Sequence, residues 1–117
     1  MTIQLIDREA TEELERQIGR ARLERVVGIQ LVHGRGLLEK LAALGASPDP
    51  HAVRLLAHQI AGSSSAVGMT ALGEAAATLE SLVLSGTVVD LAPFVQALWK
   101  LGVDSHDALE SAFPRSA

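Results

Sequence analysis

The sequence predicts an all-α fold, specifically an antiparallel up-and-down four-helix bundle with a short additional helix at its N-terminus. Apolar residues recur at the spacing of helix turns along the chain, and no long stretch alternates apolar and polar residues as a half-buried strand would. Hydrophobic residues make up 48% of the chain and aromatic residues only 3%, so the core must be built from aliphatic side chains. A length of 117 residues suits one core, and residues 1–117 are therefore expected to form a single domain.

The first two helices are predicted from a cap, a break and a long apolar repeat. Asp7 can cap a short helix, and Gly19 is expected to break it. A long helix follows from about Arg20 to Leu44, and Gly45 ends it. Its buried side is marked by apolar residues at helical spacing, namely Leu23, Val26, Val27, Leu31, Leu38, Leu41 and Leu44.

The third helix is expected from about His51 to Ser65 or Ala66, after the turn Ser47-Pro48-Asp49-Pro50. With Ile60 at the centre of the buried face and about 100° of rotation per residue, His58 lies about 160° away, on the outside. The apolar stripe around Ile60 consists of Val53, Leu56, Ala57, Ser64 and Val67.

The last two helices follow the short connection Val67-Gly68-Met69. Thr70 is expected to cap the fourth helix and Gly86 to end it. Asp90 is expected to cap the fifth helix, in whose first turn Pro93 is tolerated. The inner faces are marked by Leu72, Ala76, Leu79, Leu82 and Val83 in the fourth helix and by Phe94, Leu98, Leu101, Ala108 and Leu109 in the fifth.

The imidazole of His58 is expected to be exposed and to have mostly small neighbours. Ala61, Gly62 and Ser65 lie one turn along the helix, and Arg54 and Leu55 lie one turn back. Gly62 costs about 1 kcal/mol in a helix interior relative to alanine. An exposed imidazole beside a costly glycine is easier to explain as a docking and reaction site than as packing.

An exposed imidazole has a specific chemical use. A neutral imidazole is a good nucleophile towards a phosphoryl group near pH 7, because its ordinary pKa is about 6.5. The sequence has no glycine-rich phosphate loop, and no cluster of carboxylates that could hold Mg²⁺ lies near His58. The metal, the second acceptor and the charge neutralisation would therefore have to come from a partner.

The stretch Ala57-His58-Gln59-Ile60-Ala61-Gly62-Ser63-Ser64, with Val67-Gly68, Leu72 and Leu79-Glu80 after it, resembles the histidine-containing phosphotransfer (HPt) domain. That family's pattern is roughly A-H-x-L-K-G-S-x-x-x-L-G, then L and L-E in the next helix. The resemblance extends over nearly the whole chain. It implies a four-helix bundle that carries a phosphoryl group between receiver-domain aspartates in the phosphorelay of a two-component system, with His58 as the phosphorylated residue.

The resemblance also implies partners and docking residues. The partners are response-regulator receiver domains, a hybrid histidine kinase, or both, and the receiver supplies Mg²⁺ because the chain has no cofactor of its own. Gly62 is the small residue that lets the receiver approach. Ser63 or Ser64 could hydrogen-bond near the site, although Ser64 projects inwards, and Ser65 is a further docking candidate. Fraying at the helix end explains the serine run equally well.

One position departs from the family pattern, since a lysine usually stands where this chain has Ala61. Arg54, on the same face, could supply the missing charge, or it is an ordinary solvated cation. Leu55 belongs to an apolar docking patch or is an ordinary surface leucine. Two functions follow: a phosphohistidine carrier, which is not a self-contained enzyme, or a non-catalytic helical module that docks a kinase or receiver without efficient transfer.

Composition excludes several other classes. A net charge of −4 without a basic patch makes nucleic acid an improbable partner. The chain has no cysteine, and His33, His51 and His106 share no ligand spacing, so no metal site is expected. We expect no signal peptide and no membrane span, and therefore a cytoplasmic protein, which is expected to be a monomer.

Overall fold

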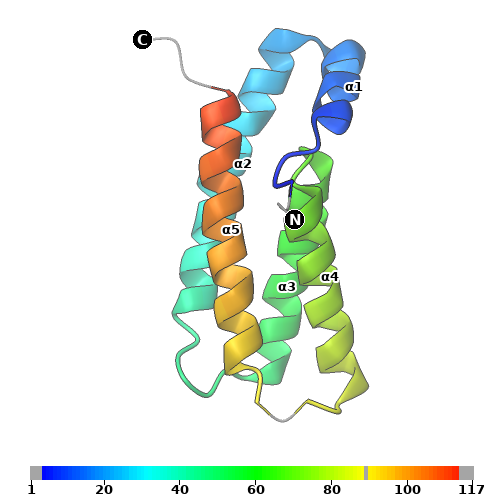
Figure 1. The fold of residues 1–117 in the computed structure, drawn as a ribbon. Helices are drawn as coiled ribbons and strands as arrows, with labels where there is room; N and C mark the ends of the chain where they lie inside the picture. Colours follow the sequence, from blue (N-terminus) through cyan, green and yellow to red (C-terminus); the bar gives the residue numbers. More distant parts are fainter. Residues whose placement is uncertain (1–3, 89, 114–117) are drawn as a thin grey trace.

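The computed structural model describes residues 4–88 and 90–113, and this part of the chain is helical with no strand. The elements are α1 (Arg8–Ile18), α2 (Arg20–Ala42), α3 (Pro50–Ala66), α4 (Thr70–Ser85) and α5 (Ala92–Ala112). The all-α prediction is confirmed. Figure 1 shows α2 to α5 side by side with the chain reversing direction at each connection, while α1 lies across the end where α3 gives way to α4.

The helix boundaries correct four details of the sequence prediction. The second helix ends at Ala42 rather than Leu44, and Gly45 follows with a positive φ of 77°. The third helix begins at Pro50, where Asp49 caps it by accepting a hydrogen bond from the Ala52 amide at 3.0 Å.

The predicted caps of the last two helices were each wrong by one position. Thr70 is the first residue of α4, and buried Met69 occupies the cap position without a side-chain hydrogen bond. Leu91 occupies the cap position of α5. Asp90 still accepts a hydrogen bond from the Ala92 amide at 3.1 Å, so its carboxylate satisfies the helix end from one residue further out.

The core is aliphatic, as the composition predicts, and runs through all four long helices. It consists of Leu23, Val27, Leu31, Leu37, Leu38, Leu41, Val53, Leu56, Ala57, Ile60, Val67, Met69, Leu72, Ala76, Leu79, Leu91, Val95, Leu98 and Leu109. Two residues that the apolar repeat assigned to the core, Val26 and Phe94, are exposed instead. Periodicity alone cannot tell the edge of a buried stripe from its centre.

A buried polar cluster joins α2 to α5. The imidazole of His106 is fully buried, with Nδ1 2.7 Å from the Gly102 carbonyl oxygen and Nε2 3.3 Å from Nε2 of Gln30. The carbonyl can only accept, so Nδ1 donates to it and the Gln30 amide donates to Nε2. Gly34 leaves room for this ring, because a Cβ there would overlap the His106 side chain.

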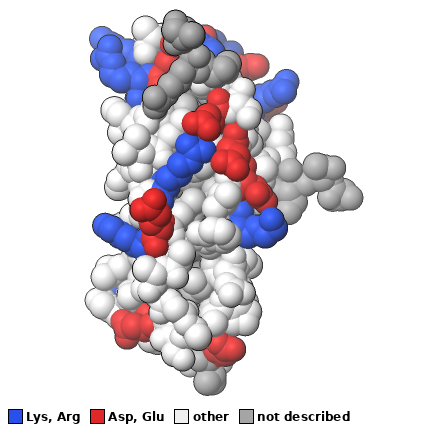
Figure 2. Space-filling view, turned by 90° about the vertical axis from the view of Figure 1, so that its left-hand side faces the viewer, with Lys and Arg blue, Asp and Glu red and all other residues white. Residues whose placement is uncertain are grey.

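Ion pairs flank this cluster at the surface. Arg35 of α2 pairs with Asp107 at 3.0 Å and with Glu110 at 3.2 Å, both on α5. The face shown in Figure 2 carries interleaved positive and negative side chains over its upper part, whereas its lower end is largely uncharged. The charges on this side are therefore concentrated towards the end of the bundle where α5 finishes.

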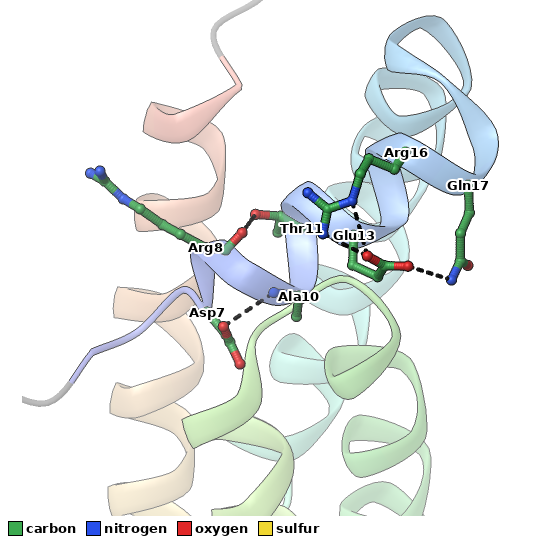
Figure 3. A network of polar contacts seen from close by, with 7 residues as sticks. All are labelled: Asp7, Arg8, Ala10, Thr11, Glu13, Arg16 and Gln17. Atoms are coloured by element: carbon green, nitrogen blue, oxygen red, sulfur yellow. Dashed lines mark hydrogen bonds and ion pairs between the residues drawn. The ribbon is translucent and has the colours of Figure 1, made fainter.

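The short helix α1 is fixed by its own cap and by the turn that it covers. Asp7 accepts a hydrogen bond from the Ala10 amide, and the Thr11 hydroxyl donates to the Arg8 carbonyl, while Glu13 binds Arg16 and Gln17 at the surface (Figure 3). The Asp7 amide donates to the Gly68 carbonyl at 2.8 Å. Thr11 lies against Gly68, whose φ of 85° and close contact both favour glycine. This contact fixes the turn that joins α3 to α4.

Candidate functional site

The structure places His58 on the outward side of α3, as the helix geometry predicts. Its side chain is 71% exposed, whereas Ile60, two residues along, is buried in the core. The helix that carries it begins at a proline and a capping aspartate and packs most extensively against α4. The imidazole therefore stands on a rigid support and not on a loop, which is how a reactive group is held in a defined orientation.

The imidazole is not as bare as the sequence suggested. Its Nδ1 lies 3.1 Å and 3.2 Å from the two carboxylate oxygens of Glu80, which comes from α4. Glu80 is itself mostly buried, with a side chain that is 20% exposed. Glu80 is the site residue whose contact the sequence analysis missed, because it lies 22 residues away in sequence.

The contact with Glu80 determines which ring nitrogen can react. A carboxylate accepts hydrogen bonds and donates none, so Nδ1 of a neutral imidazole carries the proton and gives it to this bond. The lone pair is then on Nε2, the nitrogen on the far side of the ring. Two helices thus combine to present one nucleophilic nitrogen in a fixed orientation.

Arg54 lies at the same place, one turn before His58. Its Nη1 is 4.0 Å from Oε2 of Glu80, the oxygen that also contacts the imidazole. The Arg54 side chain is 30% exposed. The carboxylate of Glu80 therefore contacts the imidazole on one side and approaches the guanidinium of Arg54 on the other.

The residues one turn from His58 on α3 leave open space beside the imidazole. A Cβ added at Gly62 would meet nothing within 4 Å, so the fold has no steric need for glycine there. Leu55 is 45% exposed and Ala61 is half-buried. The surface beside the imidazole therefore has no side chain at Gly62 and an exposed apolar side chain at Leu55.

The three serines that follow Gly62 differ in their surroundings. The Ser63 and Ser64 hydroxyl oxygens are buried and find no hydrogen-bond partner among the residues that the structure describes. The Ser65 hydroxyl lies against Gly73 of α4, where a Cβ would overlap it. Of the three, Ser64 projects inwards as its helix position predicts, Ser63 is half-buried, and Ser65 is exposed.

Neither a metal site nor a membrane span is found in the described part of the chain. Residues 4–88 and 90–113 contain no group of three or more His, Asp or Glu that could hold a metal ion. Within the same ranges, no helix is both long enough and apolar enough to cross a membrane.

Comparisons with known proteins found a matching family model and a similar solved structure. The family model described as the Hpt domain matches residues 8–112. Among solved structures, the chain is similar to the crystal structure of histidine-containing phosphotransfer protein B (HptB) from Pseudomonas aeruginosa PAO1, with a TM-score of 0.82 and 18% sequence identity. That match covers 99% of this chain and 100% of the other. No curated protein sequence matches the chain.

Proposed function

The chain belongs to the Hpt domain family, and we propose that it is a phosphorelay carrier that accepts a phosphoryl group on Nε2 of His58. The donor is the phosphorylated aspartate of a receiver domain or hybrid histidine kinase, and the acceptor is the receiver domain of a response regulator. The observation that carries the proposal is the contact between His58 and Glu80, which holds Nδ1 and leaves Nε2 exposed. An up-and-down four-helix bundle suits this role because it presents the imidazole on a rigid outer face.

The proposed step forms one bond and breaks one. The Nε2 lone pair attacks the phosphorus of an aspartyl phosphate, the phosphorus–oxygen bond to the aspartate breaks, and the aspartate leaves as a carboxylate. The proton on Nδ1 stays on the ring, where its bond to Glu80 stabilises the positive charge that develops on the imidazole. The receiver supplies Mg²⁺ for its own phosphoryl oxygens, and this chain contributes the nucleophile and its orientation.

Two further residues are assigned to the transfer as part of this proposal. Ala61 leaves the site without the lysine that is usual in the family, and Arg54 supplies the positive charge in its place. Arg54 lies one turn before His58 on α3 and approaches Glu80 at 4.0 Å, so its guanidinium must leave Glu80 and turn towards Nε2 to meet a phosphoryl group there. Arg54 thus helps to neutralise the charge of the transferring oxygens.

Docking of the receiver is assigned to the surface around the imidazole. Gly62 allows close approach, since nothing in the fold itself requires a glycine there. Leu55 supplies an exposed apolar contact beside it. Ser63 and Ser65 are assigned to the edge of this surface, where Ser65 is exposed and the buried Ser63 hydroxyl turns outwards when the receiver docks. The cytoplasm is the proposed location.

The test is transfer of labelled phosphate from a phosphorylated receiver domain, followed by mapping of the label. We expect acid-labile label on His58 of the wild-type chain and none on His58→Gln. His51→Gln is the matched control, because His51 is another exposed histidine of α3, and it should be labelled normally. Label on a different residue would overturn the assignment.

A second donor separates intrinsic chemistry from docking. Phosphoramidate phosphorylates imidazoles without any partner protein, so its reaction with His58 depends only on the imidazole and its surroundings. Glu80→Gln should slow this reaction about tenfold, because a neutral amide neither fixes the Nδ1 proton nor stabilises developing charge as a carboxylate does. An unchanged rate would show that Glu80 has no part in the chemistry.

The alternative function is a non-catalytic module that docks a kinase or receiver. The alanine at position 61 favours it, since the usual cation is missing. The two functions make opposite predictions in the labelling experiment. A chain that binds a phosphorylated receiver but gains no label on His58 is a docking module.

A further inference from the structure

The helical glycines of this chain fall into two groups. Gly34, Gly73 and Gly102 are needed within the fold, because a Cβ at each would overlap a side chain of a neighbouring helix. Gly28, Gly36 and Gly62 have nothing within 4 Å of the position that a Cβ would take. Each of these three costs about 1 kcal/mol of helix stability relative to alanine without a compensating contact in the fold. Gly62 is accounted for by the docking surface around His58, whereas Gly28 and Gly36 lie on α2 and have no such role.

Gly28 and Gly36 belong to an exposed face of α2, here called the outer face and made up of Arg25, Gly28, Ile29, Val32, Gly36 and Glu39. At about 100° per residue these positions lie within about 60° of the direction of Val32. Arg35 lies at the same angular limit on the other side, where its ion pairs with Asp107 and Glu110 draw its side chain towards α5. Val32 is 73% exposed, the highest value among the exposed large apolar residues, and Ile29 is 64% exposed, close to the 66% of Leu84 on α4. Arg25, Gly28, Ile29 and Val32, together with His33, line a shallow depression on this face. The outer face thus combines unpartnered aliphatic side chains with empty space above two glycines.

From these observations we propose that the outer face of α2 binds the same face of a second copy of this chain, with the two α2 helices antiparallel. A two-fold axis at Val32 pairs each position with the one equally far on the other side of residue 32. Gly28 of one copy then approaches Gly36 of the other, so the helix axes come close together. Ile29 of each copy fills the space above Gly36 of the partner, and the two Val32 side chains meet at the axis.

Charge complementarity selects this arrangement. The same axis places Arg25 opposite Glu39 of the other copy, and it does so twice because the interface is symmetric. Neither residue takes part in an ion pair within the part of the chain that the structure describes. A parallel arrangement would instead place Arg25 against Arg25. Arg22 and Lys40 lie about 80° from the direction of Val32, at the solvated rim of the face.

The interface is small, so the dimer is reversible. A single helix from each copy buries less than the roughly 1,200–2,000 Å² of stable specific complexes, and weak association is the rule below that size. The sequence alone indicated a monomer, which is also the expected state of a dilute solution of this chain. His58 lies on α3 and contacts α4, so it stays exposed in the dimer.

The test is sedimentation equilibrium of the whole chain from about 10 µM to about 1 mM, the range where small interfaces associate. We expect the average mass to rise from 12.3 kDa towards twice that value. Arg25→Glu and Glu39→Arg should each weaken association about tenfold, since each places like charges opposite one another twice. The double variant should dimerise like the wild type.

The mixing experiment is the sharpest, because only a two-fold antiparallel pairing predicts its result. An equimolar mixture of the Arg25→Glu and Glu39→Arg variants should associate more tightly than either variant alone, since both ion pairs re-form in the heterodimer. Glu74→Arg is the matched control, a charge reversal at an exposed position of α4, and it should leave the mass profile unchanged. In NMR spectra, the amide signals of Gly28 and Gly36 should shift with concentration while that of Gly62 does not.

Three outcomes would overturn the proposal. A mass of 12.3 kDa at every concentration excludes the dimer. If neither Arg25→Glu nor Glu39→Arg weakens association, the dimer forms through another surface. The same conclusion follows if Glu74→Arg weakens association equally. If the chain stays monomeric and Arg25→Glu reduces transfer from a phosphorylated receiver, the outer face is occupied by a different protein.

Discussion

The α3–α4 pair and the α2–α5 pair each hold a histidine between two helices, but they use it in opposite ways. On α3, His58 is 71% exposed, and only Nδ1 is engaged, by a carboxylate. On α5, His106 is 1% exposed, and both ring nitrogens are engaged, by a carbonyl and an amide. A buried imidazole with both nitrogens hydrogen-bonded contributes to packing and has no free lone pair for a reaction. An imidazole held at one nitrogen keeps the other available for chemistry.

The glycines beside the two histidines differ in the same way. Gly34 makes room for His106 within the fold, whereas Gly62 faces open space beside His58. A glycine that the fold needs and a glycine that only a partner needs therefore respond differently to substitution. Substitution at Gly34 should therefore change stability, and substitution at Gly62 should change transfer.

The largest effect is expected for Gly62→Gln. A long side chain one turn from His58 blocks the approach of the receiver, so phosphotransfer should fall by at least about 100-fold, equivalent to about 2.7 kcal/mol in the barrier. The free energy of unfolding should stay the same or rise by up to about 1 kcal/mol, because glutamine is the better helix former. Transfer kinetics and urea denaturation of the same sample measure both. A normal transfer rate would show that the receiver does not approach over this position.

The converse effect is expected for Gly34→Ala. The added methyl group overlaps the His106 ring and approaches the Gln30 amide, so the cluster must shift and unfolding should become easier by about 1–3 kcal/mol. Phosphorylation of the remaining folded protein should continue at the wild-type rate. Gly28→Ala is the control on the same helix and should stabilise the chain or leave it unchanged. Equal destabilisation by both variants would mean that the His106 pocket is not tightly packed.

The buried histidine also predicts a pH dependence. Burial lowers the pKa of the His106 imidazole below its ordinary value, and the nearby Arg35 lowers it further, while the Gly102 carbonyl and Asp107 oppose the change. The unfolded chain therefore binds a proton at this residue more readily than the folded chain does. Stability should be fully present above about pH 6.5 and should decline as pH falls through that value.

The measurement is the free energy of unfolding between about pH 7.5 and about pH 5, a window above the usual range of carboxylates. His106→Gln should flatten the decline, since it removes the titrating group. His51→Gln, at an exposed site, should not. A decline of the same steepness in His106→Gln would assign the pH dependence to other groups.

The sequence predicted most of the fold because helical spacing and caps are local signals. Asp7 and Gly19 act within a few residues of where they stand, and the breaks at Gly45 and Gly86 are local too. The exposure of His58 followed from the position of Ile60 on one helix. Val26 and Phe94 were misplaced because the edge of a buried stripe depends on how neighbouring helices pack.

The contact with Glu80 could not be read from one helix, because it depends on the register between two. The pairs His58–Glu80 and Ser65–Gly73 are both symmetric about position 69, where the turn between α3 and α4 ends. An antiparallel hairpin centred on Met69 would have predicted both pairs. The length of the connection between α3 and α4 therefore contained the information needed to predict the His58–Glu80 contact. The residues that flank His106 along the chain contain no comparable indication that its side chain is fully buried.

The smallest expected effect concerns the cation beside His58. Ala61→Lys places an ammonium one turn from the imidazole, where it can neutralise charge on the transferring oxygens, so transfer from a phosphorylated receiver should become faster. The gain should be largest when Arg54 is replaced by alanine, because the two cations share one task and their effects should not add. At this partly exposed site each charge is worth at most about 1 kcal/mol, or several-fold in rate. A double-mutant cycle on the transfer rate at fixed salt measures the coupling.

Since Arg54 also approaches Glu80, the same cycle with phosphoramidate as donor shows whether Arg54 acts on the imidazole itself or only in the complex with the receiver. Strict additivity with both donors, or no loss from Arg54→Ala alone, would make Arg54 a bystander and leave the charge stabilisation to the partner.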